Sequence, residues 1–251
     1  MGGCAYEYQV KNRKDEGELF AITPNGPMLA YLTLAYDLYV LKHHQLLQGK
    51  LIKRLKDHNN FHGARYELLV AATFIRAGFD IDFEDERDGR SKHPEFVATH
   101  KASGHKFDVE AKKRNRKTKL NKEDFDSSGA KISIGSLLSN AFLKFRRRPF
   151  IVCIDMDIPP YAGNPFQQNW SREILESPDK SGGRNREGKD CFNVIFFTNH
   201  PVDYTLEEPS SFNYLLMISQ VPDIEIKSYD PIWALDKAFA QCGKIPSKFD
   251  E

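Results

Sequence analysis

The sequence predicts an α/β protein, because patterns typical of helices and of strands follow one another in its first 160 residues. Apolar residues recur at helical spacing across residues 63–77, and Gly78 then provides a helix stop. Residues 107–111 alternate apolar and charged side chains, which predicts a strand with two unlike faces. Residues 150–154 form a short uninterrupted apolar run, which predicts a buried strand.

Length and composition are those of a globular protein. A chain of 251 residues can bury a substantial core as one large domain or two small ones. Apolar residues make up 40% of the chain and charged residues 28%, as in soluble globular proteins. The net charge is +1, so the chain has no global basic field. Any binding of nucleic acid must therefore come from local basic patches.

The cysteine spacing and the lack of targeting patterns predict a cytoplasmic protein that does not bind a membrane. None of the four cysteines lies at metal-binding spacing from another, which favours reduced thiols. They are Cys4, Cys153, Cys191 and Cys242. We find no signal peptide and no apolar run of membrane length. Gly2 suggests myristoylation, but Tyr6 stands where that pattern requires Ser or Thr, so we expect no lipid anchor.

Residues 1–60 are predicted to form an N-terminal helical extension. A turn signal at residues 24–27 precedes apolar residues that recur at helical spacing from residue 28 to residue 56. The pattern predicts one long helix or two helices that pack on the core. The same segment could instead be an oligomerisation arm, so a homodimer or a larger complex stays open.

Strand and helix patterns alternate through the rest of the chain, and residues 161–251 are expected to complete the domain begun by residues 61–160. A charged loop at residues 84–93 separates the first strand from a hairpin, whose turn lies at residues 101–104. Strands are predicted at residues 79–83, 96–99, 107–111, 150–154, 192–197 and 214–218, and helices at residues 132–145 and 233–242.

The charged face of the second hairpin strand holds candidate residues for a functional site. Asp108, Glu110 and Lys112 alternate with apolar residues, so their side chains share one face of the strand. Residues two apart on a strand lie roughly 6.5 Å apart. The carboxylate of Glu110 and the ammonium of Lys112 can therefore converge on one small site.

Three motifs occur in a fixed order along these elements: Glu67 on a helix, Pro94-Glu95 at the start of a hairpin, and Glu110-Ala111-Lys112 on its second strand. This order resembles the PD-(D/E)XK nuclease superfamily. The resemblance implies a restriction-endonuclease-like core, in which helices flank a central mixed β-sheet, at residues 61–160. The sequence departs from the family pattern at Glu95, where the family usually has aspartate.

The resemblance also implies a Mg²⁺-dependent nuclease that hydrolyses phosphodiester bonds, with Mn²⁺ as a substitute metal. Its catalytic residues would be Glu67, Glu95, Glu110 and Lys112. Glu95 and Glu110 would bind the metal, with Asp108 as an accessory ligand, and Lys112 would orient the attacking water. The expected substrate is DNA rather than RNA, in restriction, repair or defence.

Residues 112–122 hold seven basic residues and no acidic one, directly after the charged strand. We expect phosphate contacts from members of this run, namely Lys113, Arg114, Arg116, Lys117 and Lys119. The alternative is a solvated loop, which is the commoner structure for a run of like charges. A non-catalytic nucleic-acid-binding or assembly subunit on the same fold remains the second functional class.

Overall fold

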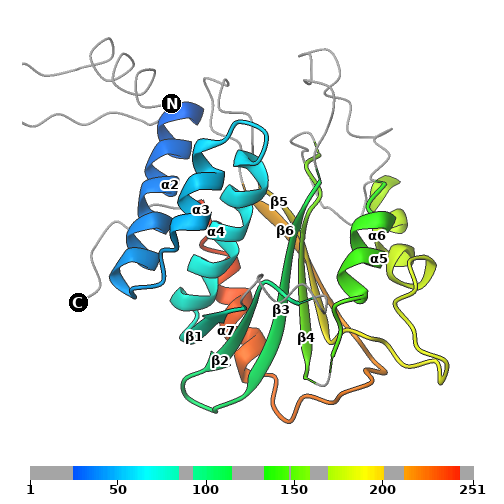
Figure 1. Cartoon of the computed structure of the whole chain (residues 1–251). Helices are drawn as coiled ribbons and strands as arrows, with labels where there is room; N and C mark the ends of the chain where they lie inside the picture. The colour runs from blue at the N-terminus through cyan, green and yellow to red at the C-terminus, as the bar shows by residue number, and fades with distance from the viewer. Residues whose placement is uncertain are drawn as a thin grey trace, which may run out of the picture.

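A computed structural model describes residues 25–84, 93–114, 133–146, 148–158, 169–200 and 212–243. It confirms the predicted α/β class: a six-stranded mixed sheet lies between two groups of helices (Figure 1). No helix of these residues is long and apolar enough to cross a membrane.

The strands follow one another across the sheet in chain order, β1-β2-β3-β4-β5-β6. The first three pair antiparallel, β3, β4 and β5 run parallel, and β6 is antiparallel to β5. Their bounds are β1 Phe79–Phe83, β2 Phe96–His100, β3 Lys106–Lys113, β4 Phe150–Asp155, β5 Val194–Asn199 and β6 Asn213–Ile218. The change from antiparallel to parallel pairing thus falls at β3, the strand that carries the charged motif.

Helices cover both faces of the sheet (Figure 1). One face packs against α2 (Gly26–His43), α3 (Gly49–Lys56), α4 (Phe61–Arg76) and α7 (Asp230–Phe239). The other packs against α5 (Gly135–Phe142) and α6 (Asn169–Lys180). The sheet therefore separates two hydrophobic cores, and each strand in its middle contributes alternate side chains to each core.

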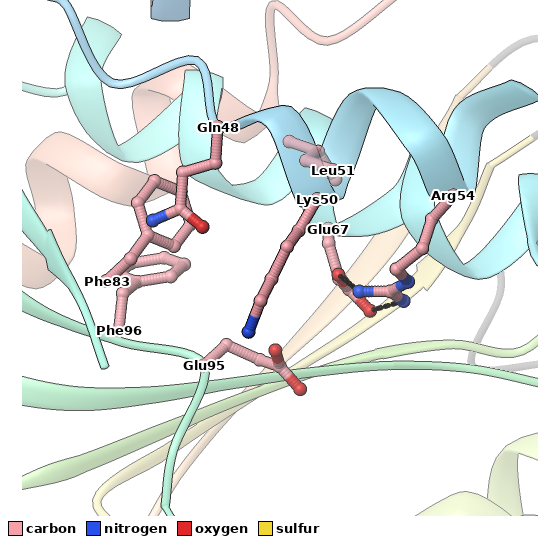
Figure 2. A pocket seen from close by; sticks show the side chains of 8 residues that line it. All are labelled: Gln48, Lys50, Leu51, Arg54, Glu67, Phe83, Glu95 and Phe96. Atoms are coloured by element: carbon pink, nitrogen blue, oxygen red, sulfur yellow. Dashed lines mark hydrogen bonds and ion pairs between the residues drawn. The ribbon is translucent and has the colours of Figure 1, made fainter. Parts of the chain in front are cut away.

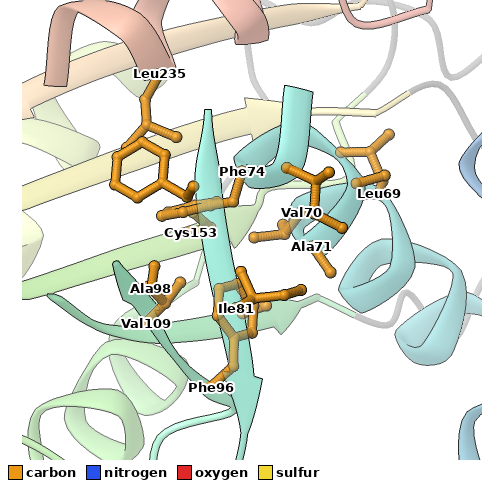
Figure 3. Packing of buried hydrophobic residues seen from close by; sticks show 14 of the residues in the cluster. Leu69, Val70, Ala71, Phe74, Ile81, Phe96, Ala98, Val109, Cys153 and Leu235 are labelled. Carbon is orange, nitrogen blue, oxygen red and sulfur yellow. The ribbon is translucent and has the colours of Figure 1, made fainter. Parts of the chain in front are cut away.

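The alternation of β3 is realised as the sequence predicts. Phe107, Val109 and Ala111 lie in the core beneath α4, where Val109 is surrounded by aromatic and aliphatic side chains (Figure 3). Asp108 and Glu110 point to the opposite face, toward α5, and both are fully buried. Burying a carboxylate costs free energy unless cations or donors accompany it, so this face must supply partners.

In its described part, residues 25–60, the predicted N-terminal extension forms two helices, α2 and α3, and both pack on α4. Asp37 of α2 is buried and accepts a hydrogen bond from Arg65 at 2.7 Å and another from Arg76 at 2.7 Å. Leu41 and Leu51 of the extension belong to the same core as α4. The extension is therefore fixed to the helix that carries Glu67.

Replacing Asp37 with alanine is expected to lower the free energy of unfolding by roughly 3–5 kcal/mol, because it leaves a buried guanidinium without its counter-ion. The side chain of Arg65 is only 3% exposed. Urea unfolding followed by circular dichroism measures the loss. Asp80→Ala is the matched control, because Asp80 pairs with Lys101 on the surface and its loss should cost no more than about 1 kcal/mol. Equal losses in the two variants would contradict the expectation.

Candidate active site

Glu95, Glu110 and Lys112 meet between the start of β2 and the end of β3. Glu95 directly precedes β2, and its backbone N–H donates to the carbonyl of Val109 at 2.9 Å. Lys112 Nζ lies 2.7 Å from Glu110 Oε1 and 3.3 Å from Glu95 Oε1. The structure thus brings together two carboxylates and the lysine that the sequence analysis placed in one site.

A second lysine, Lys144, enters the same site and was missed by the sequence analysis. Its Nζ lies 2.8 Å from Oε1 and 2.9 Å from Oε2 of Glu110, and 3.6 Å from Oε1 of Glu95. The periodicity predicts a helix at residues 132–145, but α5 ends at Phe142, and Lys144 follows in a tighter turn. The residue is therefore outside the helix and can reach β3. The one sequence signal is that it begins a run of basic residues.

The electrostatics of the site are dominated by the burial of Glu110. Burial raises the pKa of Glu110 to about 7, and Glu95 adds to this rise, while Lys112 and Lys144 oppose it. For Lys112, burial alone would lower the pKa, but the carboxylates of Glu110 and Glu95 outweigh burial and raise it. The lysine therefore keeps its proton at neutral pH, whereas Glu110 gains or loses one there.

Glu67 faces the same site from α4 but is held by an arginine. The two terminal guanidinium nitrogens of Arg54, on α3, each donate to its carboxylate at 2.6 Å (Figure 2). Burial raises the pKa of Glu67 and outweighs Arg54, which lowers it. Glu67 and Glu95 line a small open pocket of about 50 Å³ between α3 and the sheet, into which Lys50 also points (Figure 2). The pocket has room for a few water molecules beside both carboxylates.

Asp108, the predicted accessory ligand, has a different partner. Its Oδ1 accepts from Arg148 Nε at 2.7 Å, and its other oxygen, Oδ2, is buried without a hydrogen-bond partner. Arg148 also lies 3.9 Å from Glu84. The carboxylate of Asp108 is thus paired with Arg148 rather than grouped with Glu95 and Glu110. The geometry therefore does not support the predicted role of Asp108 as a metal ligand.

The basic run after β3 is described only at its beginning. Lys113 continues the strand, so its side chain turns to the face opposite Lys112, where it is 4% exposed and paired with Asp155. Lys113 is thus engaged by Asp155, and its predicted phosphate contact stays a prediction. Arg114 donates to the carbonyl of Met156 at 3.4 Å. The remaining predicted contacts lie outside the described residues; they are Arg116, Lys117 and Lys119.

Glu95 and Glu110 are the candidate ligands for a metal ion. Among the residues that the structure describes, no group of three or more His, Cys, Asp and Glu side chains could hold a metal ion. Glu95 and Glu110 nevertheless share two ammonium groups, and Glu110 Oε1 is buried without a hydrogen bond of good geometry. Oxygen donors suit Mg²⁺, which keeps several waters when one or two carboxylates bind it. The carboxylate oxygens of this pair are therefore of the ligand type that a largely hydrated Mg²⁺ ion accepts.

Comparison of the chain with models of protein families, with curated proteins and with solved structures gives no significant match. The class to which the protein belongs must therefore be inferred from its own residues.

Proposed function

We propose that the protein is a metal-dependent nuclease with a restriction-endonuclease-like core, and that it hydrolyses phosphodiester bonds in DNA. The observation that carries the proposal is the position of the Lys112 ammonium, which bridges the carboxylates of Glu95 and Glu110. The order of elements adds support, because α4, β1, β2, β3, α5 and β4 follow the order that the resemblance implies. Glu67 on α4 faces the pocket that Glu95 also lines.

Each side chain has a defined task in this proposal. A bound Mg²⁺ ion would supply charge screening of the phosphate and a water of lowered pKa. Glu95 and Glu110 would hold that ion from β2 and β3. Lys112, whose raised pKa keeps it charged, donates hydrogen bonds to the attacking water or to a phosphate oxygen. Glu67 accepts hydrogen bonds from water in the pocket while Arg54 fixes its orientation.

The test is incubation of the purified protein with plasmid, linear duplex, single-stranded DNA and RNA, each with and without Mg²⁺ or Mn²⁺. We expect cleavage of DNA that stops when EDTA removes the metal. Absence of cleavage of all four substrates in both metals would contradict the proposal. Cleavage of RNA alone would replace DNA by RNA as the substrate while retaining the reaction.

The second candidate function is a non-catalytic nucleic-acid-binding subunit. One observation favours it: two ammonium groups neutralise the two carboxylates, so the set needs no metal ion for charge balance. Such a subunit would bind DNA equally well with EDTA and with Mg²⁺, and it would not cleave.

Helix α3 is expected to contribute to DNA binding in either case. Lys50 and Lys53 are exposed on it, and Lys50 reaches toward Glu95 at the pocket (Figure 2). The double substitution Lys50→Gln and Lys53→Gln should weaken binding to all duplex sequences alike. The slope of log affinity against log salt should fall by roughly 0.9 for each phosphate that the variant no longer touches. Fluorescence anisotropy at several salt concentrations measures both quantities.

The matched control is the double substitution Lys180→Gln and Lys189→Gln. Both lysines are exposed, and they lie on α6 and in the segment that follows it, away from α3. Because this variant removes the same net charge, it corrects for the global electrostatic effect. Equal reductions of affinity and slope in the two variants would show that α3 makes no local contact.

A further inference from the structure

Lys144 occupies the position between the two carboxylates that a bridging cation would take. Its ammonium is within 2.9 Å of both oxygens of Glu110 and 3.6 Å from Oε1 of Glu95. Lys112 also bridges the two carboxylates, at 2.7 Å from Oε1 of Glu110 and 3.3 Å from Oε1 of Glu95, but it contacts only one oxygen of Glu110. Lys144 therefore contacts both oxygens of a carboxylate that is itself fully buried.

The charges of this group already balance. Glu95 and Glu110 carry two negative charges when ionised, and Lys112 and Lys144 carry two positive charges. A Mg²⁺ ion held by the same carboxylates would require oxygens at about 2.0–2.1 Å. Two ammonium groups that remain in hydrogen-bond contact with those oxygens would then repel the ion at close range. One ammonium must withdraw before a metal ion can bind.

Backbone placement indicates which lysine withdraws. Lys112 belongs to β3, which is paired with β2 on one side and with β4 on the other. Lys144 lies beyond the end of α5, in neither a helix nor a strand. A four-carbon side chain at such a position can swing toward solvent without disturbing the sheet.

We propose that Lys144 is an internal cation that competes with a divalent metal ion for Glu110 and Glu95, and so sets the metal affinity of the site. The proposal rests on the proposed metal-dependent function. It assigns to Lys144 a role distinct from that of Lys112, because its ammonium leaves the carboxylates when the metal binds.

The test measures metal binding directly. The full chain and its Lys144→Met variant are titrated with Mn²⁺, and free Mn²⁺ is determined by electron paramagnetic resonance. Methionine keeps an unbranched side chain, one atom shorter than that of lysine and without its charge, and Lys112 still neutralises Glu110 in the variant. We expect the dissociation constant for Mn²⁺ to fall by at least roughly tenfold, since a like charge is removed from beside the ion. An unchanged or higher dissociation constant would overturn the proposal.

Three further variants separate charge from shape and from general effects. Lys144→Gln, which is also neutral, should bind Mn²⁺ more tightly than the parent, and it replaces Lys144→Met if that protein does not fold. Lys144→Arg keeps the charge and should not tighten binding; tightening equal to that of Lys144→Met would overturn the proposal. Lys180→Met, at an exposed ion pair with Glu176, should leave the affinity unchanged.

The outcomes also distinguish this proposal from the proposed function. If the parent cleaves DNA with metal, and Lys144→Met binds Mn²⁺ like the parent, only the role of Lys144 fails. If the parent and both neutral variants bind no Mn²⁺ and cleave nothing, the role of Lys144 and the metal-dependent function fail together. Tighter Mn²⁺ binding by both neutral variants without any cleavage supports the role of Lys144 and contradicts the nuclease.

Discussion

Lys112→Ala is expected to reduce metal-dependent cleavage of DNA by at least roughly 10²–10³-fold, the effect of removing one group that stabilises charge in a transition state. Alanine removes the ammonium, through which the Lys112 side chain donates hydrogen bonds to water or phosphate beside the carboxylates. The protein should remain folded, because Lys144 still contacts both oxygens of Glu110 at 2.8 and 2.9 Å. Single-turnover cleavage of a labelled duplex measures the effect.

Three measurements make the Lys112 result specific. Thermal unfolding checks that the variant is folded, and anisotropy checks that it still binds DNA. Lys101→Ala is the control, because Lys101 lies in the exposed turn between β2 and β3 and makes a surface ion pair with Asp80. Undiminished cleavage by a folded Lys112→Ala protein would remove Lys112 from the mechanism.

Glu95→Gln is expected to lose Mg²⁺-dependent cleavage by more than roughly 100-fold, because an amide is a much weaker metal ligand than a carboxylate. The backbone of Glu95 is fixed by its hydrogen bond to Val109 at 2.9 Å. Glu187→Gln is the control, because Glu187 pairs with Lys189 at 3.9 Å on the surface. Full activity of Glu95→Gln would contradict its assignment as a metal ligand.

Glu95→Asp tests whether the site has adapted to glutamate. Shortening the side chain by one methylene withdraws the carboxylate by about 1.3 Å, whereas Mg²⁺ requires oxygens at about 2.0–2.1 Å. We expect a large loss of cleavage in Mg²⁺ and partial recovery in Mn²⁺, which binds such sites more tightly. Cleavage by Glu95→Asp that equals the parent in Mg²⁺ would show that the backbone at β2 already suits aspartate.

The sequence predicted the parts of the site that depend on local periodicity. Alternation along residues 107–111 is sufficient to place Glu110 opposite the apolar face, because side-chain direction in a strand follows from residue number. The same rule, extended by two residues, places Lys113 on the apolar side with Asp155, as the structure shows. The predicted strand ends before Lys113, whereas β3 includes it.

Contacts that depend on tertiary packing could not be predicted in this way. Lys144 reaches Glu110 because α5 ends at Phe142, and the helical pattern itself continues to residue 145. Arg54 meets Glu67 because α3 packs across α4, and the two residues are on separate helices. Asp108 is joined by Arg148, which approaches from the segment before β4. None of these three pairings leaves a spacing signal in the sequence.

The buried contact of Asp37 with Arg65 and Arg76 bears on how this protein can change over generations. Replacing α2 with an unrelated helix would remove Asp37. Arg65, two positions before Glu67, would then be a buried charge without its counter-ion. Substitutions at Asp37 should therefore be accompanied by substitutions at Arg65 in descendants of this chain, whereas the exposed Tyr31 and Tyr39 of the same helix are free to vary. We therefore expect α2 and α4 to be inherited together as a single unit.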